Sequence, residues 1–126
     1  MDLLESIEID YNSGLPVWVQ LRNRAAYLIM TGAYSEGDRL PTVRALAAAL
    51  DISYNTANRA YMDLEREGLI STRRGRGTFV LEVDPSKLDN ERATVEILVE
   101  EMIGAALNIG MDRDSIVKLV LSKLDC

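Results

Sequence analysis

The chain contains no histidine and only one cysteine, Cys126. Histidine is the commonest metal ligand and the commonest general base, so its absence argues against most metal sites and most acid–base catalysis. A single thiol forms no internal disulfide and supplies too few ligands for a structural zinc site. No nucleophile–base pair and no phosphate-binding glycine loop stands out either. We therefore expect no catalytic residues, no metal and no cofactor.

Long apolar runs are also absent. None approaches the roughly 20 residues needed to span a bilayer, and residues 1–5 (MDLLE) are acidic where a signal peptide would be basic. Together with the lack of paired cysteines, this pattern predicts a protein of the reducing cytoplasm without a membrane partner. Apolar residues still make up 48% of the chain, which is enough for a packed core.

Acidic residues outnumber basic ones, but the two are unevenly distributed. The net charge is −6 at pH 7. Between Pro16 and Val80, nine arginines stand against six acidic residues, which gives +3, whereas the five basic and fourteen acidic residues elsewhere give −9. Such polarity is typical of a nucleic-acid-facing module joined to a solvated module with another task.

Two short helices are expected in the middle of the chain. Small and apolar residues recur at helical spacing over residues 42–50 and again over residues 53–67, with a short break between them. Gly68 follows the second segment, as is common after a helix. The pattern predicts two helices joined by a tight turn.

A β-hairpin is expected directly after these helices. Residues 69–72 and 78–83 have strand-like composition, and residues 73–77 (RRGRG) join them. Helix, tight turn, helix and hairpin in this order form a winged helix-turn-helix, which places one helix and one cationic loop where both can touch DNA.

Helices are also expected on both sides of this segment. An apolar stripe at helical spacing begins at Trp18, which we expect to be a buried anchor of the core. Residues 84–87 resemble a linker, and two further helices are predicted from about 90 to 108 and after Asp112.

The expected architecture is therefore mainly α with a small β-hairpin. A winged helix-turn-helix domain would occupy residues 1–83, with a short N-terminal extension at 1–15. A two-helix domain would occupy residues 84–126.

The start of the helix at 53–67 is the candidate for reading DNA, because a recognition helix enters the major groove by its N-terminal end. The candidate residues are Ser53, Tyr54, Asn55, Thr56, Asn58 and Arg59. Asparagine can pair with adenine through two hydrogen bonds, and a threonine methyl can pack against thymine. Because serine and threonine are also common helix caps, capping alone is the competing interpretation for Ser53 and Thr56.

Arginines supply the remaining candidates for DNA contact. The hairpin tip combines Arg73, Arg74 and Arg76 with Gly75 and Gly77, so that charge and tight turns occur together. Arginine inserts well into a narrow minor groove, whose negative potential attracts it.

The helix at 42–50 contributes one more arginine. Arg44 lies in its first turn and is a candidate for a phosphate or groove contact. The alternative is an ordinary surface arginine.

Several motifs in this region resemble the GntR family of bacterial transcription regulators. They are LPTVRALA at 40–47, S-x-x-T-A-x-R-A-Y-x-x-L-x-x-x-G-L-I at 53–70, G-x-G-T-F-V at 75–80, and P-x-W-x-Q-L at 16–21. The resemblance runs over residues 9–80, and the short two-helix tail is similar to that of the YtrA-type subfamily.

The resemblance implies a DNA-binding regulator, with DNA contacts at Arg44, residues 53–56, Asn58 or Arg59, and the wing around 74–77. Many members have arginine where this chain has Tyr54 and Asn58, so the operator sequence does not follow from the family.

The last two predicted helices are too apolar to bury their faces alone. We expect them to pair with a second copy, because a symmetric dimer presents two recognition helices one DNA turn apart. The alternative is that they fold back on the winged domain. The candidate dimerisation residues are Val95, Leu98, Val99, Met102, Ile103, Leu107, Ile116, Val117, Val120 and Leu121.

The expected function is a homodimeric regulator that binds an inverted-repeat operator in double-stranded DNA and represses its own operon. The resemblance suggests that such an operon encodes a transporter. The competing function is a winged-helix protein-interaction module without DNA binding. No residue cluster marks a pocket for a small-molecule effector, so the sequence leaves an effector open but gives it no support.

Overall fold

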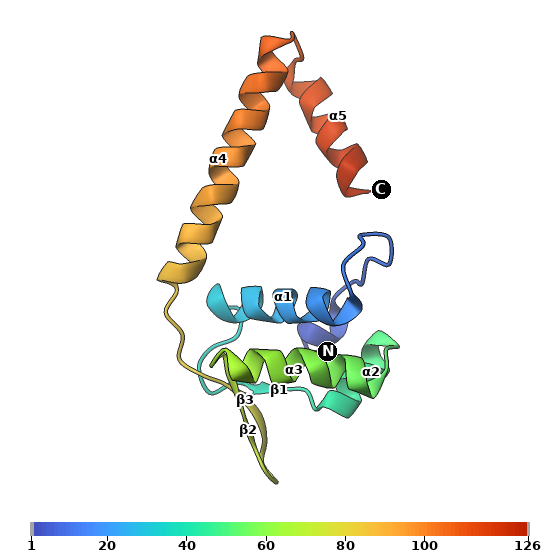
Figure 1. Ribbon diagram of the computed structural model, residues 1–126, viewed down its shortest axis with the longest axis vertical. Coiled ribbons are helices and arrows are strands. Elements are labelled where there is room, and N and C mark those ends of the chain that lie inside the picture. The colour runs from blue at the N-terminus through green and yellow to red at the C-terminus, as the bar shows by residue number, and fades with distance from the viewer. Residues whose placement is uncertain (1, 126) are drawn as a thin grey trace. The chain divides into compact units, whose positions relative to one another are not determined.

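The computed structural model describes residues 2–125 (Figure 1). It is mainly α-helical with a small three-stranded antiparallel sheet, which confirms the predicted fold class. The elements in chain order are η1 (Leu4–Ser6), α1 (Val17–Met30), β1 (Arg39–Leu40), α2 (Val43–Leu50), α3 (Tyr54–Arg66), β2 (Ile70–Arg73), β3 (Gly77–Val80), α4 (Ser86–Asn108) and α5 (Arg113–Leu124). The chain divides into two compact units, and the division falls between Pro85 and Ser86.

The first unit has a core built by α1, α2 and α3. The stripe predicted on α1 is buried from Leu21 onwards, and the inward side of α3 is buried from Ala57 to Leu64. Leu46 and Ala47 supply the buried side of α2. A fully buried leucine contributes about 1.5–3 kcal/mol relative to an exposed one, so these stripes account for the packing of the three helices.

The N-terminal residues close this core from one side, which the sequence did not indicate. Leu4, in the 3-10 helix η1, is fully buried. The Tyr34 hydroxyl accepts a hydrogen bond from the Leu4 backbone N–H at 3.1 Å and donates one to the Asp2 carboxylate. Burial and the neighbouring Asp2 carboxylate raise the pKa of Tyr34 well above its usual value. The hydroxyl therefore stays protonated and keeps both hydrogen bonds.

The sheet has the strand order β1-β3-β2, so the predicted hairpin gains a third, two-residue strand. Because side chains alternate along a strand, one face carries Leu40, Ile70, Thr78 and Val80, and all four are buried against the core. The other face points outward. Figure 1 shows the β2–β3 hairpin extending beyond the three helices.

The second unit is a pair of helices joined by a short turn. Helix α4 begins four residues earlier than the predicted Asn90. Gly110 takes a φ of +94°, and the Met111 N–H donates to the Ala106 carbonyl at 3.0 Å, which closes the end of α4. The Asp112 carboxylate then caps α5 by accepting from the Ser115 N–H at 2.8 Å, as predicted. This hydrogen bond lowers the pKa of Asp112.

Within residues 2–125, no helix combines the length and the apolar character that crossing a membrane requires.

Candidate nucleic-acid interface

The turn between α2 and α3 is short and is fixed by the backbone. Thr42 caps α2 by accepting from the Ala45 N–H at 3.0 Å. After α2, Asp51 takes the left-handed conformation with φ +54°, and the Ile52 N–H donates to the Ala47 carbonyl at 3.0 Å. Aspartate tolerates this conformation better than most residues. Helix α3 therefore begins directly at the next cap, as a helix-turn-helix requires.

Ser53 and Thr56 are both engaged in capping α3. The Ser53 Oγ accepts from the Thr56 N–H at 3.1 Å and lies 2.7 Å from the Thr56 Oγ1. Tyr54 and Asn55, between them, are exposed and free to meet a ligand. Capping α3 is therefore part of the role of Ser53 and Thr56. The side chains of Tyr54 and Asn55 remain exposed.

The next turn of α3 is organised by two side-chain contacts. The Arg59 guanidinium lies over the Trp18 ring of α1, 4.2 Å from the ring centroid. The Asn58 amide donates to the Met62 sulfur at 3.4 Å, and Met62 is 62% exposed. A cation over an indole face is attracted by the ring's quadrupole, so Trp18 holds the Arg59 head group in one place.

Trp18 itself corrects a prediction. It was expected to be a buried anchor, but it is only half-buried. Its spacing in the apolar stripe predicted burial, whereas the ring lies at the edge of the stripe and has Arg59 as its partner. No local pattern indicates this pair, because the two residues are 41 positions apart.

The first turns of α2 and α3 contain no acidic side chain, although Asp51 lies two residues before the cap of α3. The acids of α3 lie in its last turns, where Asp63 pairs with Arg22 of α1 at 2.9 Å and with Arg66, and Glu67 pairs with Arg22. Within the two first turns, no carboxylate opposes the positive end of the helix dipole.

Arg44 and the wing arginines are available for a ligand. All four are exposed, and in the part of the chain that the structure describes, the ion pairs that form use Arg22, Arg66 and Arg92 instead. Arg44 lies in the first turn of α2, as predicted.

The wing is a tight turn between β2 and β3. Gly75 and Gly77 have φ values of +77° and +118°, which residues with a Cβ rarely adopt. The Arg76 N–H donates to the Arg73 carbonyl at 2.9 Å and closes the turn. Thr72 and Thr78 face each other across the hairpin with their hydroxyls 3.3 Å apart. The arginines are thus carried by a fixed turn.

One arginine near the wing was not singled out from the sequence. Arg39, on β1, places its guanidinium against Gly77, so that a Cβ atom on Gly77 would lie 2.8 Å from the Arg39 Nε. β1 has only two residues, too few for a strand pattern to show, and the sequence signal was limited to an extended piece near Pro41.

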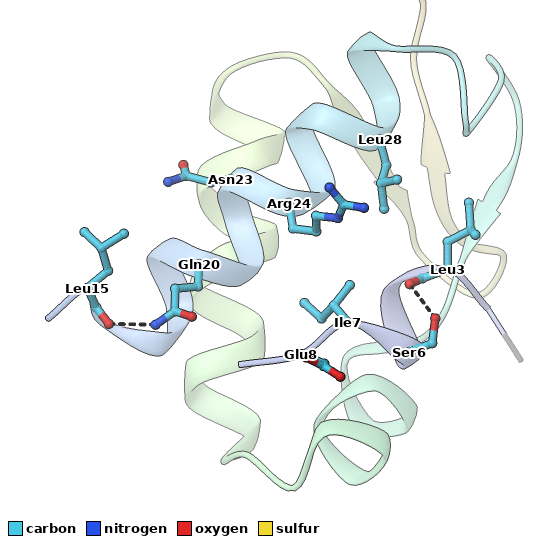
Figure 2. A pocket seen from close by; sticks show the side chains of 9 residues that line it. All are labelled: Leu3, Ser6, Ile7, Glu8, Leu15, Gln20, Asn23, Arg24 and Leu28. Atoms are coloured by element: carbon cyan, nitrogen blue, oxygen red, sulfur yellow. Dashed lines mark hydrogen bonds between the residues drawn. The ribbon is translucent and has the colours of Figure 1, made fainter. Parts of the chain in front are cut away.

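The described residues contain a hollow of about 670 Å³ between the N-terminal segment and α1 (Figure 2). The Gln20 amide there donates to the Leu15 carbonyl at 2.9 Å, and the Ser6 hydroxyl donates to the Leu3 carbonyl at 3.1 Å. The Arg24 guanidinium lies 5.4 Å from the Tyr27 ring centroid. Because these polar groups have partners within the protein, the hollow offers few groups that await a ligand.

No cluster of three or more acidic or cysteine side chains within residues 2–125 could hold a metal ion. Cys126 lies outside the described residues.

The second unit exposes the apolar side chains that were predicted for dimerisation. Thirteen of the nineteen exposed large apolar residues lie on α4, α5 or the turn between them. The predicted set is exposed apart from Ile116, which is half-buried; Leu98 and Leu121, for example, are 58% and 50% exposed. Only Ala106 is buried among the described residues of this unit.

The cap of α3 allows a test that separates stability from ligand binding. Replacing Ser53 by alanine removes the acceptor for the Thr56 N–H, and we expect the free energy of unfolding in urea to fall by about 1 kcal/mol. Replacing Ser53 by aspartate retains a capping acceptor but adds a negative charge. We expect this variant to keep its stability and to bind duplex DNA about tenfold more weakly. A tenfold loss corresponds to roughly 1.4 kcal/mol of repulsion between the aspartate and the DNA phosphates. Unchanged DNA binding of the aspartate variant would place this end of α3 outside the interface.

Comparison with known families and proteins gives consistent matches. The family model described as bacterial regulatory proteins, gntR family, matches residues 20–80. The HTH-type transcriptional regulator Rv1152 of Mycobacterium tuberculosis is 34% identical over 113 residues, which cover 90% of this chain and 89% of that protein. The HTH-type transcriptional repressor YtrA of Bacillus subtilis is 43% identical over 76 residues, which cover 60% of this chain and 58% of that protein.

Solved structures give the same picture. YtrA from Sulfolobus acidocaldarius, a GntR-family transcription factor, superposes with a TM-score of 0.58 at 28% identity, covering 78% of this chain and 97% of that one. AraR(DBD) in complex with operator ORX1 superposes with a TM-score of 0.53 at 28% identity, covering 59% of this chain and 92% of that one.

Proposed function

Because this chain belongs to the GntR family of bacterial regulatory proteins, we propose that it is a sequence-specific repressor that binds DNA as a homodimer in the cytoplasm. The observation that carries the proposal is the presence, in one unit, of a capped α3 and a wing whose exposed arginines form no ion pair within residues 2–125. The relatives are named as transcriptional regulators, not as enzymes.

Affinity comes mainly from arginine contacts to phosphates. Arg44 at the start of α2 and the wing arginines have no acidic partner within the described residues to give up. Each phosphate that they neutralise releases a counterion, which makes binding depend on salt. These contacts fix the position of the protein on the duplex and carry no sequence information themselves.

Specificity comes from the first two turns of α3. Tyr54 and Asn55 are exposed at its start, and Asn58 and Arg59 follow on the next turn. Good contacts to base edges contribute roughly 1–3 kcal/mol of discrimination each. Trp18 limits the freedom of Arg59 and so lowers the entropy lost when it binds.

We assign DNA binding to residues 1–83 and dimerisation to residues 84–126. The exposed apolar side chains of α4 and α5 support this assignment, because an isolated helix pair leaves such a surface in water. Two identical units related by a two-fold axis match an inverted-repeat operator.

Repression follows from occupancy of an operator that overlaps a promoter. The Bacillus subtilis relative is named a transcriptional repressor, which supports this sign. We propose that the chain controls its own operon, and the family resemblance suggests a transporter operon as the target.

A protein-interaction module without DNA binding is the competing function. The wing argues against it, since such a module has no need of three exposed arginines on one tight turn.

The proposal is tested with the DNA upstream of the gene. We expect that fragment to bind in the nanomolar range or tighter at physiological salt, at least about a thousandfold tighter than an unrelated duplex of equal length. Fluorescence anisotropy measures both affinities, and a promoter fusion measures whether binding lowers transcription. Equal affinity for both duplexes would contradict sequence-specific binding, and raised transcription would contradict repression.

A further inference from the structure

We propose that Arg39 is a fourth DNA-contacting arginine of the wing, which binds a backbone phosphate together with Arg73 across the face of Gly77. The inference rests on the proposed function and adds to it a residue from outside the hairpin.

The first observation is the fit between Arg39 and Gly77. A Cβ atom on Gly77 would lie 2.8 Å from the Arg39 Nε, and 3.2 Å from both Cζ and Nη2. These distances place the guanidinium directly against the glycine backbone. Any larger residue at position 77 would have to displace it. The glycine therefore creates the space in which the Arg39 head group lies, in addition to allowing the φ of +118°.

The second observation is the register of the sheet. Arg39 pairs with Phe79, and Arg73 pairs with Gly77, so both arginines share the outward face of the three strands. Neighbouring strands lie about 4.8 Å apart. Two arginines thus approach Gly77 from the strands on either side of β3.

The third observation is the charge around this pair. Within the described residues, neither arginine forms an ion pair with a carboxylate. Glu36 lines a hollow on this face together with Arg73 and Arg76, but it pairs with none of them. Like charges held on one face repel each other unless an anion lies between them, and a phosphate oxygen matches the planar fork of a guanidinium.

This arrangement extends the cationic surface from the tip of the wing to its base. Arg74 and Arg76 serve the tip, whereas Arg39 and Arg73 flank the strands below it. The wing would then bind the duplex with two separate groups of arginines.

The test measures affinity for duplex DNA as a function of salt. For Arg39→Gln we expect affinity to fall about three- to tenfold on every sequence, and the slope of log K against log salt to become shallower by about one contact. For Arg39→Lys we expect the slope to be retained, because the charge remains. The matched control is Arg24→Gln, which removes an exposed arginine of α1 that lies over Tyr27, and its slope should equal that of the wild type.

Urea unfolding of each variant shows whether Arg39 contacts DNA or only stabilises the hairpin. A salt slope for Arg39→Gln equal to that of the wild type overturns the inference. If that variant also binds DNA more weakly and has a lower free energy of unfolding, Arg39 only stabilises the hairpin. Neither result affects the proposed function, which fails only if the wild-type chain shows no preference for its operator.

Discussion

Replacing Arg74 and Arg76 together by alanine lowers the affinity for duplex DNA by about a hundredfold, on operator and unrelated sequences alike. The two side chains stand at the exposed tip of the β2–β3 turn and have no acidic partner among the described residues. Their loss should remove the proposed contacts to the backbone or the minor groove and leave the proposed base contacts of α3 in place. The ratio of operator to unrelated affinity therefore changes little.

The same variant has a second readout in its salt dependence. With two fewer phosphates neutralised, the slope of log K against log salt becomes shallower by about two. The matched control removes two positive charges from the start of α4, as Lys87→Ala with Arg92→Ala, where both side chains are exposed. Wild-type affinity in the wing variant would show that the wing does not touch DNA.

We expect that replacing Leu98 and Leu121 by glutamate converts the proposed dimer into a monomer. Both side chains are at least half exposed on the separate chain, so the substitutions do not disturb the core of the first unit. In a dimer they would be buried, and two carboxylates per chain would then lose their water. Light scattering at micromolar concentration measures the result as a change from the mass of two chains to that of one.

Loss of the dimer also weakens operator binding. We expect affinity for an inverted repeat to fall by about 10²–10⁴, because the second half-site no longer benefits from linkage to the first. Affinity for a single half-site should not change. The control is Ile109→Glu, which adds one carboxylate at a residue that is 79% exposed in the turn between α4 and α5. A wild-type chain with the mass of a monomer would refute the dimer.

Most of the helical architecture could be predicted from the sequence because its signals are local. Thr42, Ser53 and Asp112 each cap a helix through a backbone N–H three residues later, and apolar spacing marks the buried sides of α1, α2 and α3. Capping and helical periodicity act over one or two turns, so a single sequence contains them in full.

The features that were missed depend on distant partners. Trp18 meets Arg59 from another helix, and Arg39 meets Gly77 only once β1 joins the sheet. Leu4 closes the core through a hydrogen bond to Tyr34, thirty residues away. No local pattern records such pairs, since each depends on how the elements pack.

The candidate DNA interface likewise combines features with local sequence signals and features that only the structure shows. The exposed start of α3 and the glycine–arginine turn could be recognised from residue types and spacing. The engagement of Ser53 and Thr56 in a shared cap required the structure, as did the finding that the wing arginines form no ion pair within residues 2–125. The candidate DNA contacts and dimerisation residues themselves stay predictions until they are measured.

The most direct test of the central claim is selection of bound sites from a pool of random duplexes by the full chain. A dimeric, sequence-specific repressor enriches an inverted repeat whose half-sites are centred about one or more helical turns of 10–10.5 base pairs apart. Recovery of unenriched DNA, or of a single half-site without a partner, would contradict the account.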